Sequence, residues 1–336
     1  MSLAPQKILN CDVAEGVFQL PGRLALHHGG SLPQPLLGWR IAGQPDAPVV
    51  LALGGISANR CVFDIAQPRM GWWHEVVGPG RALDTNRVRV LGIDYLGGSG
   101  ESTGPADGGV FPSLSSYDQA DALAQVLDHL KIRRLQAIVG ASYGAMVALA
   151  FGERYAPRVG QLVVISGADR THPMATAWRS VQRHIVRFAL AGGRATEGLE
   201  LARALAMATY RSPDEFAVRF DQPPRQIDGR FVFPVEEYLF ARGRDYASRY
   251  RAESFLCLSE SIDLHAVDAS RVAIPSTVIA VREDQLVPIA DMRALAARLP
   301  RAQLIELSSP HGHDAFLKEA AALQSVFQSL YGVIER

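Results

Sequence analysis

The segment Gly140-Ala141-Ser142-Tyr143-Gly144 constrains the fold of this chain more than any other stretch. It follows an apolar run, 135–139, and precedes an apolar helical stretch, 145–155. A glycine-x-serine-x-glycine motif in that setting indicates a strand that turns abruptly into a helix, because small residues let the two elements approach closely. The turn predicts that the Ser142 hydroxyl lies at the tip of a sheet, where unpaired amides of the next helix, beginning with Tyr143 N–H, face whatever Ser142 attacks. The same five letters also fit an ordinary turn of small residues, so the interpretation depends on partner residues downstream.

Apolar runs alternate with helical patterns along most of the chain. Uninterrupted apolar segments such as 49–53 are typical of strands buried on both faces of a parallel sheet. Residues 16–20 and 36–42 instead alternate apolar and polar side chains, which predicts an antiparallel start. We expect further strands and helices at 88–93, 116–131, 162–166, 276–281, 289–299, 303–308 and 314–331, and a short helix and turn at 71–80. The pattern predicts an α/β fold with a mostly parallel central sheet and helices on both faces.

The alternation of strands and helices stops between residues 169 and 268. We expect helices in this stretch at about 175–191, 198–210 and 234–259. The chain is therefore divided into a core domain, 1–168 and 269–336, and a helical lid insertion, 169–268. An insertion of this size in an α/β sheet commonly shapes the cleft beside the nucleophile, and the alternative is a packing appendage with no catalytic duty.

Composition excludes several classes of function. Lys plus Arg equal Asp plus Glu at 34 each, so no basic field attracts nucleic acid. Cys11, Cys61 and Cys257 are scattered and form no C-x-x-C pair, which argues against a disulfide framework or a zinc site. No apolar run approaches the ~18 residues that span a bilayer, and residues 1–11 lack an apolar signal core. We expect a cytoplasmic protein with no membrane segment, no metal and no bound cofactor, acting on a small molecule.

A serine nucleophile needs a base that takes its proton and a carboxylate that orients that base. In the α/β-hydrolase fold these partners follow the serine in the order acid, then histidine, each on a loop just after a strand. Asp284 and His313 each follow one of the last two expected strands. Glu283 is a rival acid, although the loop pattern favours Asp284. His311 is a rival base, and spacing alone does not separate it from His313.

Further stretches of the chain form an ordered set from about residue 70 to 320. They are Gly71-Trp72-Trp73, 77–87, 95–105, Ala177-Trp178, Val181-Gln182-Arg183, Thr209-Tyr210-Arg211-Ser212, 235–239 and 312–317. Taken together, this set resembles the homoserine O-acyltransferases of the α/β-hydrolase superfamily. The resemblance implies the α/β-hydrolase fold, and it favours His313 over His311 as the base.

The resemblance also implies a reaction. Ser142, with His313 and Asp284, would take an acetyl or succinyl group from an acyl-coenzyme A, and the hydroxyl of homoserine would then collect that group. Acyl-CoA enters as a co-substrate, and a homodimer is expected. In this family Arg183 binds the substrate carboxylate, which its fork of donors suits, and Asp314 holds the substrate ammonium group.

Three further roles follow from the resemblance. Tyr210 would be a further substrate-binding residue, and the N–H groups of Leu53 and Tyr143 would be the oxyanion donors. The loop 51–55 departs from the His-Ala-Leu-Thr-Gly of the family, so Gly54 or Gly55 stays open as the second donor. The nucleophile loop departs too, since it carries a tyrosine after the serine where the family usually has methionine.

Alternatives remain at this point. A serine O-acyltransferase, an esterase or lactonase that uses water, and a binding protein without catalysis all fit the same fold. Residue type alone also allows Arg183 on a helix surface and Asp314 as a helix N-cap. Discrimination between acetyl and succinyl donors, and between homoserine and serine acceptors, depends on the shape of the pocket. The residues of a sequence motif do not encode that shape.

Overall fold

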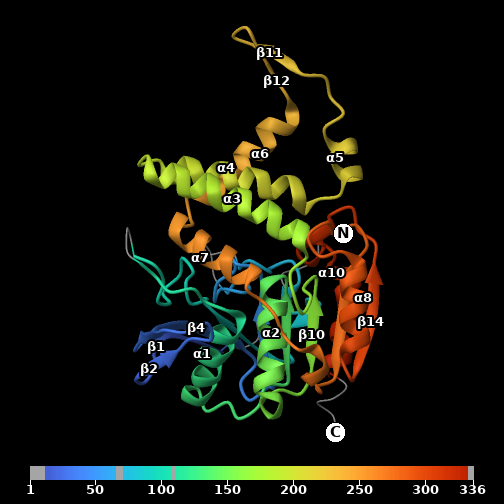
Figure 1. Ribbon diagram of the computed structural model, residues 1–336. Coiled ribbons are helices and arrows are strands. Elements are labelled where there is room, and N and C mark those ends of the chain that lie inside the picture. Colours follow the sequence, from blue (N-terminus) through green and yellow to red (C-terminus); the bar gives the residue numbers. More distant parts are fainter. Residues whose placement is uncertain (1–11, 66–70, 107–109, 332–336) are drawn as a thin grey trace.

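The computed structural model describes residues 12–65, 71–106 and 110–331 (Figure 1). Its centre is an eight-stranded sheet in the order β1-β4-β8-β5-β9-β10-β13-β14. The bounds are β1 (Asp12–Gln19), β4 (Leu36–Gly43), β5 (Val49–Leu53), β8 (Arg89–Ile93), β9 (Ala137–Ala141), β10 (Leu162–Ile165), β13 (Ser276–Val281) and β14 (Ala302–Leu307). Strand β4 is antiparallel to both of its neighbours, β1 and β8. The remaining strands of the sheet, β8, β5, β9, β10, β13 and β14, run parallel to one another. The expected α/β fold with a mostly parallel sheet is confirmed.

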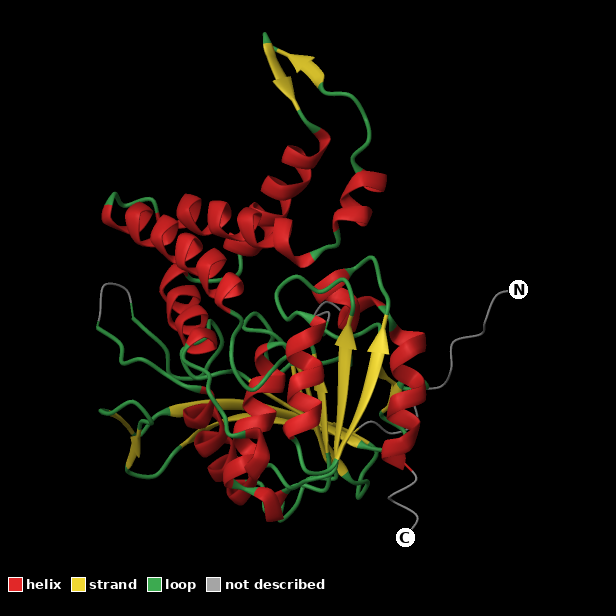
Figure 2. Ribbon diagram, turned by 45° about the vertical axis from the view of Figure 1, so that its right-hand side comes forward, coloured by secondary structure: helices red, strands yellow, loops and turns green. Residues whose placement is uncertain are grey.

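Helices cover both faces of this sheet (Figure 2). The core helices are α1 (Ser116–His129), α2 (Tyr143–Arg154), α8 (Ile289–Arg298), α9 (Ala315–Lys318) and α10 (Ala320–Tyr331), with short 3₁₀ turns at Ala156–Arg158, Ala269–Arg271 and Gly312–Asp314. Successive side chains of a strand point to opposite faces. In β9, Ile138 belongs to the hydrophobic cluster that includes Leu123 of α1, whereas Val139 belongs to the cluster that includes Phe327 of α10. The central strands β5, β9 and β10 are therefore apolar throughout because both of their faces are buried under helices.

Two expected core helices differ from the structure. Residues 71–76 form turns, and a short parallel pair follows them. The pair is β6 (Val77–Gly78) and β7 (Leu83–Asp84), and another small hairpin joins β2 (Arg23–Ala25) and β3 (Ser31–Pro33). Gly78 and Gly80 have φ of +149° and +69°, a backbone that no helix accommodates. The helix expected at 314–331 is interrupted at Glu319.

The insertion between β10 and β13 lies over the carboxyl ends of the parallel strands (Figure 2). It comprises α3 (Pro173–Ala191), α4 (Ala195–Tyr210), α5 (Pro213–Arg219), β11 (Arg225–Ile227), β12 (Arg230–Val232), α6 (Pro234–Ala247) and α7 (Ala252–Asp263). Helices α3 and α4 match two of the expected helices. Helix α5 and the β11–β12 hairpin were not expected, and the helix expected at 234–259 is divided into α6 and α7.

Local and tertiary contacts explain these differences. Asp228 and Gly229 have φ of +51° and +77°, the positive values that a tight two-residue hairpin turn requires. Between α6 and α7, the hydroxyl of Tyr250 donates a hydrogen bond to the carbonyl of Ile56. The amide of Arg251 donates to the Ser99 hydroxyl. These bonds fasten the connection to the core, so the break arises from contacts with residues far away in sequence.

The helices within the described residues are all too short or too polar to cross a bilayer. Cys61 and Cys257 are free thiols. Cys11 and the rest of segment 1–11, on which the expectation about a signal core rests, lie outside the described residues.

Candidate active site

Ser142 sits at the turn between β9 and α2 with φ of 56° and ψ of −120°. A non-glycine residue rarely adopts this conformation, and such strain persists only where the surroundings enforce it. The close packing is visible at two neighbouring glycines. A Cβ on Gly140 would lie 2.3 Å from the carbonyl oxygen of Gly144, and one on Gly144 would lie 2.3 Å from that of Leu53. The glycines of the motif therefore let β9, α2 and β5 meet at the serine.

The structure brings Ser142, His313 and Asp284 into one hydrogen-bonded line. His313 Nε2 lies 2.8 Å from Ser142 Oγ, and His313 Nδ1 lies 2.7 Å from Asp284 Oδ2. The other carboxylate oxygen of Asp284 accepts hydrogen bonds from the amides of Leu286 and Val287 at 2.9 and 3.0 Å. Both His313 and Asp284 are 5% exposed. The arrangement can therefore carry a proton between the serine and the ring while the carboxylate fixes the tautomer.

The surroundings of His313 raise its pKa. Burial disfavours the charged ring, but the charge of Asp284 and its hydrogen bond to Nδ1 outweigh burial and raise the pKa of His313 above the usual value.

The alternative acid and the alternative base that the sequence left open lie away from Ser142. Glu283 accepts from the hydroxyl of Ser308, and His311 Nδ1 lies 2.8 Å from Arg211 Nη1.

The oxyanion side of the site involves the start of α2. Tyr143 is its first residue, and the first amides of a helix lack intrahelical partners. The phenol of Tyr143 is buried and hydrogen-bonded to Ser261 at 2.6 Å, so this side chain packs beneath the site. Leu53 is placed behind Gly144 and does not line the cavity, whereas Gly55 and Ile56 do. A Cβ on Gly55 would lie 3.9 Å from Ser142 Oγ.

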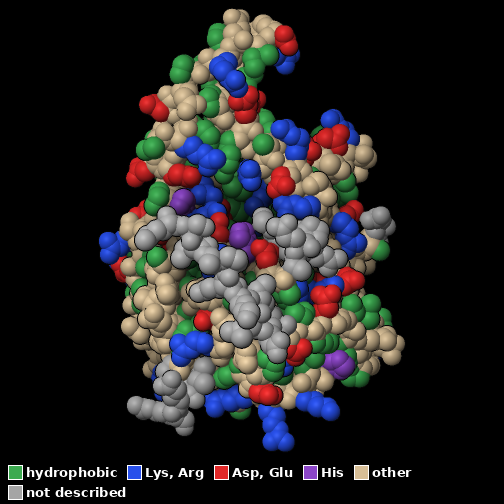
Figure 3. Space-filling view, turned by 180° about the vertical axis from the view of Figure 1, so that it is seen from behind, with side chains coloured by type: hydrophobic (Ala, Val, Ile, Leu, Met, Phe, Trp, Pro, Cys, Tyr) green, Lys and Arg blue, Asp and Glu red, His purple; other side chains and the backbone are tan. Residues whose placement is uncertain are grey.

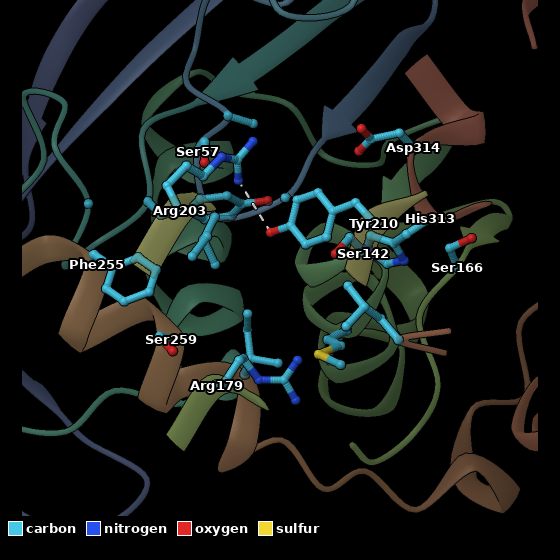
Figure 4. A pocket seen from close by; sticks show the side chains of 18 of the residues that line it. Ser57, Ser142, Ser166, Arg179, Arg203, Tyr210, Phe255, Ser259, His313 and Asp314 are labelled. Carbon is cyan, nitrogen blue, oxygen red and sulfur yellow. Dashed lines mark hydrogen bonds between the residues drawn. The ribbon is translucent and has the colours of Figure 1, made fainter. Parts of the chain in front are cut away.

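Ser142 opens onto a cavity of about 400 Å³ between the core and the insertion (Figure 4). That volume is within the range of small-molecule sites. Figure 3 shows Lys and Arg side chains gathered around a hollow where the insertion meets the core. In the described part of the chain, no cluster of His, Cys, Asp or Glu is arranged to hold a metal ion.

Arg183 does not line this cavity. Its Nη1 donates to the carbonyl of Ser259 at 3.0 Å and to Asp263 Oδ2 at 2.5 Å. The side chain therefore joins α3 to α7, which is a different place from the one that the resemblance implied. One residue along a helix rotates a side chain by about 100°, so Arg183 and its neighbour on α3 point in different directions. Gln182, the preceding residue, does line the cavity.

Arg203 of α4 lines the cavity instead, and it was not predicted. Its Nη1 donates to the hydroxyl of Tyr210 at 3.3 Å, and its guanidinium lies 5.0 and 4.8 Å from the ring centres of Tyr210 and Tyr246. Among the described residues no carboxylate pairs with it. The sequence did contain a sign that Arg203 faces inward. Arg203 lies one helical turn after the buried Leu199, on the apolar side of α4.

Tyr210 and Asp314 are both part of the cavity wall. The Tyr210 ring centre is 5.7 Å from that of His313. Asp314 Oδ2 lies 3.2 Å from Arg211 Nε, and the carboxylate is 12% exposed. Arg203 and Asp314 both line the cavity, so it offers one cation and one carboxylate, which together suit a zwitterion.

Comparison with known proteins agrees with the fold and motifs. The model of the alpha/beta hydrolase fold family matches residues 48–320. A homoserine O-succinyltransferase of Xanthomonas campestris pv. campestris is 45% identical over 305 residues, which cover 90% of this chain and 80% of that protein. A homoserine O-acetyltransferase of Thermus thermophilus is 35% identical over 78% of this chain and 72% of its own length. A serine O-succinyltransferase of Litchfieldella anticariensis is 32% identical over 91% of this chain and 95% of its own.

Solved structures share the architecture at lower identity. Esterase E22 superposes with a TM-score of 0.84 at 18% identity, covering 95% of this chain and 100% of that one. A homoserine O-acetyltransferase from Bacillus anthracis gives a TM-score of 0.83 at 18% identity, covering 96% and 98%. At such identities the similarity concerns the fold alone. The family model and the sequence relatives together place the chain in the homoserine O-acyltransferase family of α/β-hydrolase-fold proteins.

Proposed function

We propose that this protein is an acyl-CoA-dependent O-acyltransferase that moves an acetyl or succinyl group to the hydroxyl of homoserine through an acyl ester on Ser142. One observation carries the proposal. The hydrogen-bonded line of Ser142, His313 and Asp284 opens on a cavity where Arg203 has no carboxylate partner among the described residues. The sequence relatives named as homoserine acyltransferases support the same chemistry.

The first half-reaction acylates the enzyme. His313 Nε2 accepts the proton of Ser142 while Oγ attacks the thioester carbonyl. The carbon–sulfur bond then breaks, and coenzyme A leaves as a thiol with that proton. The N–H of Tyr143 and an N–H of the Gly55-Ile56 loop stabilise the oxyanion in this proposal, because both segments adjoin Ser142. The loop replaces Leu53, which lies behind Gly144.

The second half-reaction transfers the acyl group. The acceptor hydroxyl gives its proton to His313 and attacks the ester carbon, the bond to Ser142 Oγ breaks, and the proton returns to that oxygen. Arg203 binds the carboxylate of the amino acid, and Asp314 binds its ammonium group, which orients the hydroxyl toward the ester. In this scheme Arg203 takes the role that the resemblance gave to Arg183, and Tyr210 positions the guanidinium.

The insertion 169–268 acts as a lid in this proposal, because its residues and those of the core share the cavity wall. Excluding water from the acyl ester favours transfer over hydrolysis.

We also propose a cytoplasmic homodimer. Three apolar side chains spaced seven residues apart on α3, Met174, Val181 and Phe188, are 52%, 53% and 86% exposed, and a partner would cover them.

The test is a matrix of acetyl- and succinyl-CoA against homoserine, serine and no acceptor, followed by thiol release. We expect sustained thiol release with homoserine, and only one equivalent per enzyme without an acceptor. Sustained release at an equal rate without any amino acid would identify a hydrolase instead. Faster thiol release with serine than with homoserine would identify serine as the acceptor. Serine is the substrate in the name of one relative.

A further inference from the structure

A second cationic group lines the cavity on another element. Arg179 of α3 is part of the cavity wall, and its side chain is 12% exposed. Its Nε and Nη2 donate to a single oxygen, Asp263 Oδ1, at 2.9 and 2.6 Å. Within the described residues Nη1 of Arg179 makes no hydrogen bond. One polar edge of this guanidinium is therefore free to bind a ligand.

The charges around Asp263 do not balance. Arg179 binds one oxygen of this carboxylate and Arg183 binds the other. Burial raises the pKa of Asp263, but the hydrogen bonds and charges of the two arginines outweigh burial and hold it below its usual value, so the group is ionised. Two guanidinium groups thus face one carboxylate. The cluster carries an excess positive charge, which is costly in a partly buried position unless an anion joins it.

The excess charge reaches the cavity through Arg179 alone, because Arg183 does not line it. Figure 4 shows Arg179 and Arg203 on different sides of the opening, with Ser142, Tyr210 and His313 along a third side. Arg170 and Arg249 also line the cavity, but both are exposed to solvent, where a cation needs no bound partner. The cavity therefore offers two sheltered cationic positions.

The proposed transfer brings two groups into the cavity at once, the acyl chain on Ser142 and the amino acid. The amino acid has one carboxylate and one ammonium group, which Arg203 and Asp314 match. An acetyl group would leave Arg179 with no anion other than Asp263, which it shares with Arg183. A dicarboxylic acyl chain supplies a second carboxylate.

We propose that the acyl donor is a dicarboxylic acyl thioester of succinyl type, and that Arg179 binds its distal carboxylate. This inference rests on the proposed function. Ser142 Oγ forms the ester bond at the thioester carbon, coenzyme A leaves as a thiol, and the distal carboxylate keeps its charge on Arg179 throughout. Arg179 is a specificity residue, since it contacts the acyl group away from the reacting atoms.

The experiment compares succinyl-CoA with butyryl-CoA, which has the same chain length but a methyl group in place of the carboxylate. Acetyl-CoA is the third donor, and kcat/KM is measured with saturating homoserine for the full-length protein. We expect the wild type to prefer succinyl-CoA over butyryl-CoA by about 10²-fold or more, because a sheltered charge pair is lost with the neutral chain. Arg179→Met should lower kcat/KM for succinyl-CoA by a similar factor and leave butyryl-CoA within about 3-fold of wild type.

Two further variants separate the causes. Arg179→Lys keeps the charge without the fork of donors and should recover part of the preference for succinyl-CoA. Arg183→Met removes the excess charge but no donor from the cavity, so it should lower the preference for succinyl-CoA clearly less than Arg179→Met does. Equal losses of preference in Arg179→Met and Arg183→Met would overturn the assignment of direct contact. A wild type that uses acetyl-CoA as well as succinyl-CoA would overturn the inference while leaving acyl transfer intact. No transfer from any donor would overturn the proposed function itself.

Discussion

Arg203 donates a hydrogen bond to the hydroxyl of Tyr210 at 3.3 Å, and its guanidinium lies 5.0 Å from the centre of the same ring. The ring of Tyr210 lies in turn 5.7 Å from that of His313. In the proposed reaction, the residue that binds the acceptor carboxylate therefore packs against a tyrosine whose ring lies beside that of the base. If Arg203 binds the amino acid as proposed, we expect Tyr210 to link that binding to the orientation of the hydroxyl at His313.

The first prediction concerns Arg203. Arg203→Met should raise KM for homoserine and lower kcat/KM by about 10²-fold or more, because a charged hydrogen-bonded pair with the substrate carboxylate is lost. Arg203→Lys should recover only part of the loss, since a point charge does not replace a planar fork. Arg183→Met is the matched control on α3, and its KM for homoserine should stay near the wild-type value. Steady-state kinetics with varied homoserine measure both parameters, and a larger KM change at Arg183 would restore the role that the resemblance gave it.

The second prediction concerns the nucleophile. Ser142→Ala should lower the rate of acyl transfer by about 10⁴-fold or more and abolish covalent labelling by a fluorophosphonate. Ser166→Ala is the matched control, because Ser166 also lines the cavity and follows the neighbouring strand β10. That variant should still be labelled. Near-normal transfer by Ser142→Ala would rule out an acyl ester at this position.

The third prediction is a pH dependence. His313 acts as a base only when its ring is neutral, and Asp284 raises its pKa. The acid limb of kcat/KM should therefore lie above the ordinary pKa of histidine, ~6.5, and activity should fall as pH drops through it. In Asp284→Asn the opposing effect of burial remains while the raising charge is gone, so the limb should move to lower pH and kcat should fall by about 10⁴-fold. A limb that stays at the wild-type pH in this variant would mean that another group controls it.

Sequence reasoning located the three side chains that the structure joins because each follows a strand. Buried strands are easy to recognise from continuous apolar runs, and parallel strands end at the same edge of a sheet. Ser142, Asp284 and His313 therefore had to lie near one another once the strands were placed. His311 was not separable from His313 by spacing, because both flank Gly312 and only the contacts of the folded chain, Arg211 for His311 and Asp284 for His313, distinguish the two rings.

The cavity residues of the insertion were harder to predict for a physical reason. Arg183 and Arg203 both lie on amphipathic helices, and neither sequence position says which neighbouring helix covers it. In the structure Arg183 meets Asp263 of α7, while Arg203 packs between Tyr210 and Tyr246 of α6. These contacts join helices that are distant along the chain. Propensity and periodicity describe one helix at a time and do not contain that information.

The fourth prediction concerns assembly. If a second copy of the chain covers the exposed apolar row of α3, the protein should be a dimer by light scattering coupled to size exclusion. Changing Val181 and Phe188 together to Glu should yield a monomer, because buried charges without partners oppose association. Val218→Glu on α5 is the control, since Val218 is 85% exposed and lies on another helix. A monomeric wild type would remove the dimer from the proposal.

The last prediction concerns the close packing that supports the nucleophile. A methyl group on Gly144 would lie 2.3 Å from the carbonyl oxygen of Leu53, a contact that only backbone movement can relieve. Gly144→Ala should therefore lower the free energy of unfolding by about 1–3 kcal/mol and also lower kcat, since the shift moves the amides beside Ser142. Gly192→Ala is the matched control, because the nearest heavy atom would lie 3.6 Å from its Cβ. Its effect on stability should stay within about 0.5 kcal/mol. Denaturant unfolding of the two variants measures the difference, and equal stability would mean that β5 and α2 approach less closely than the motif requires.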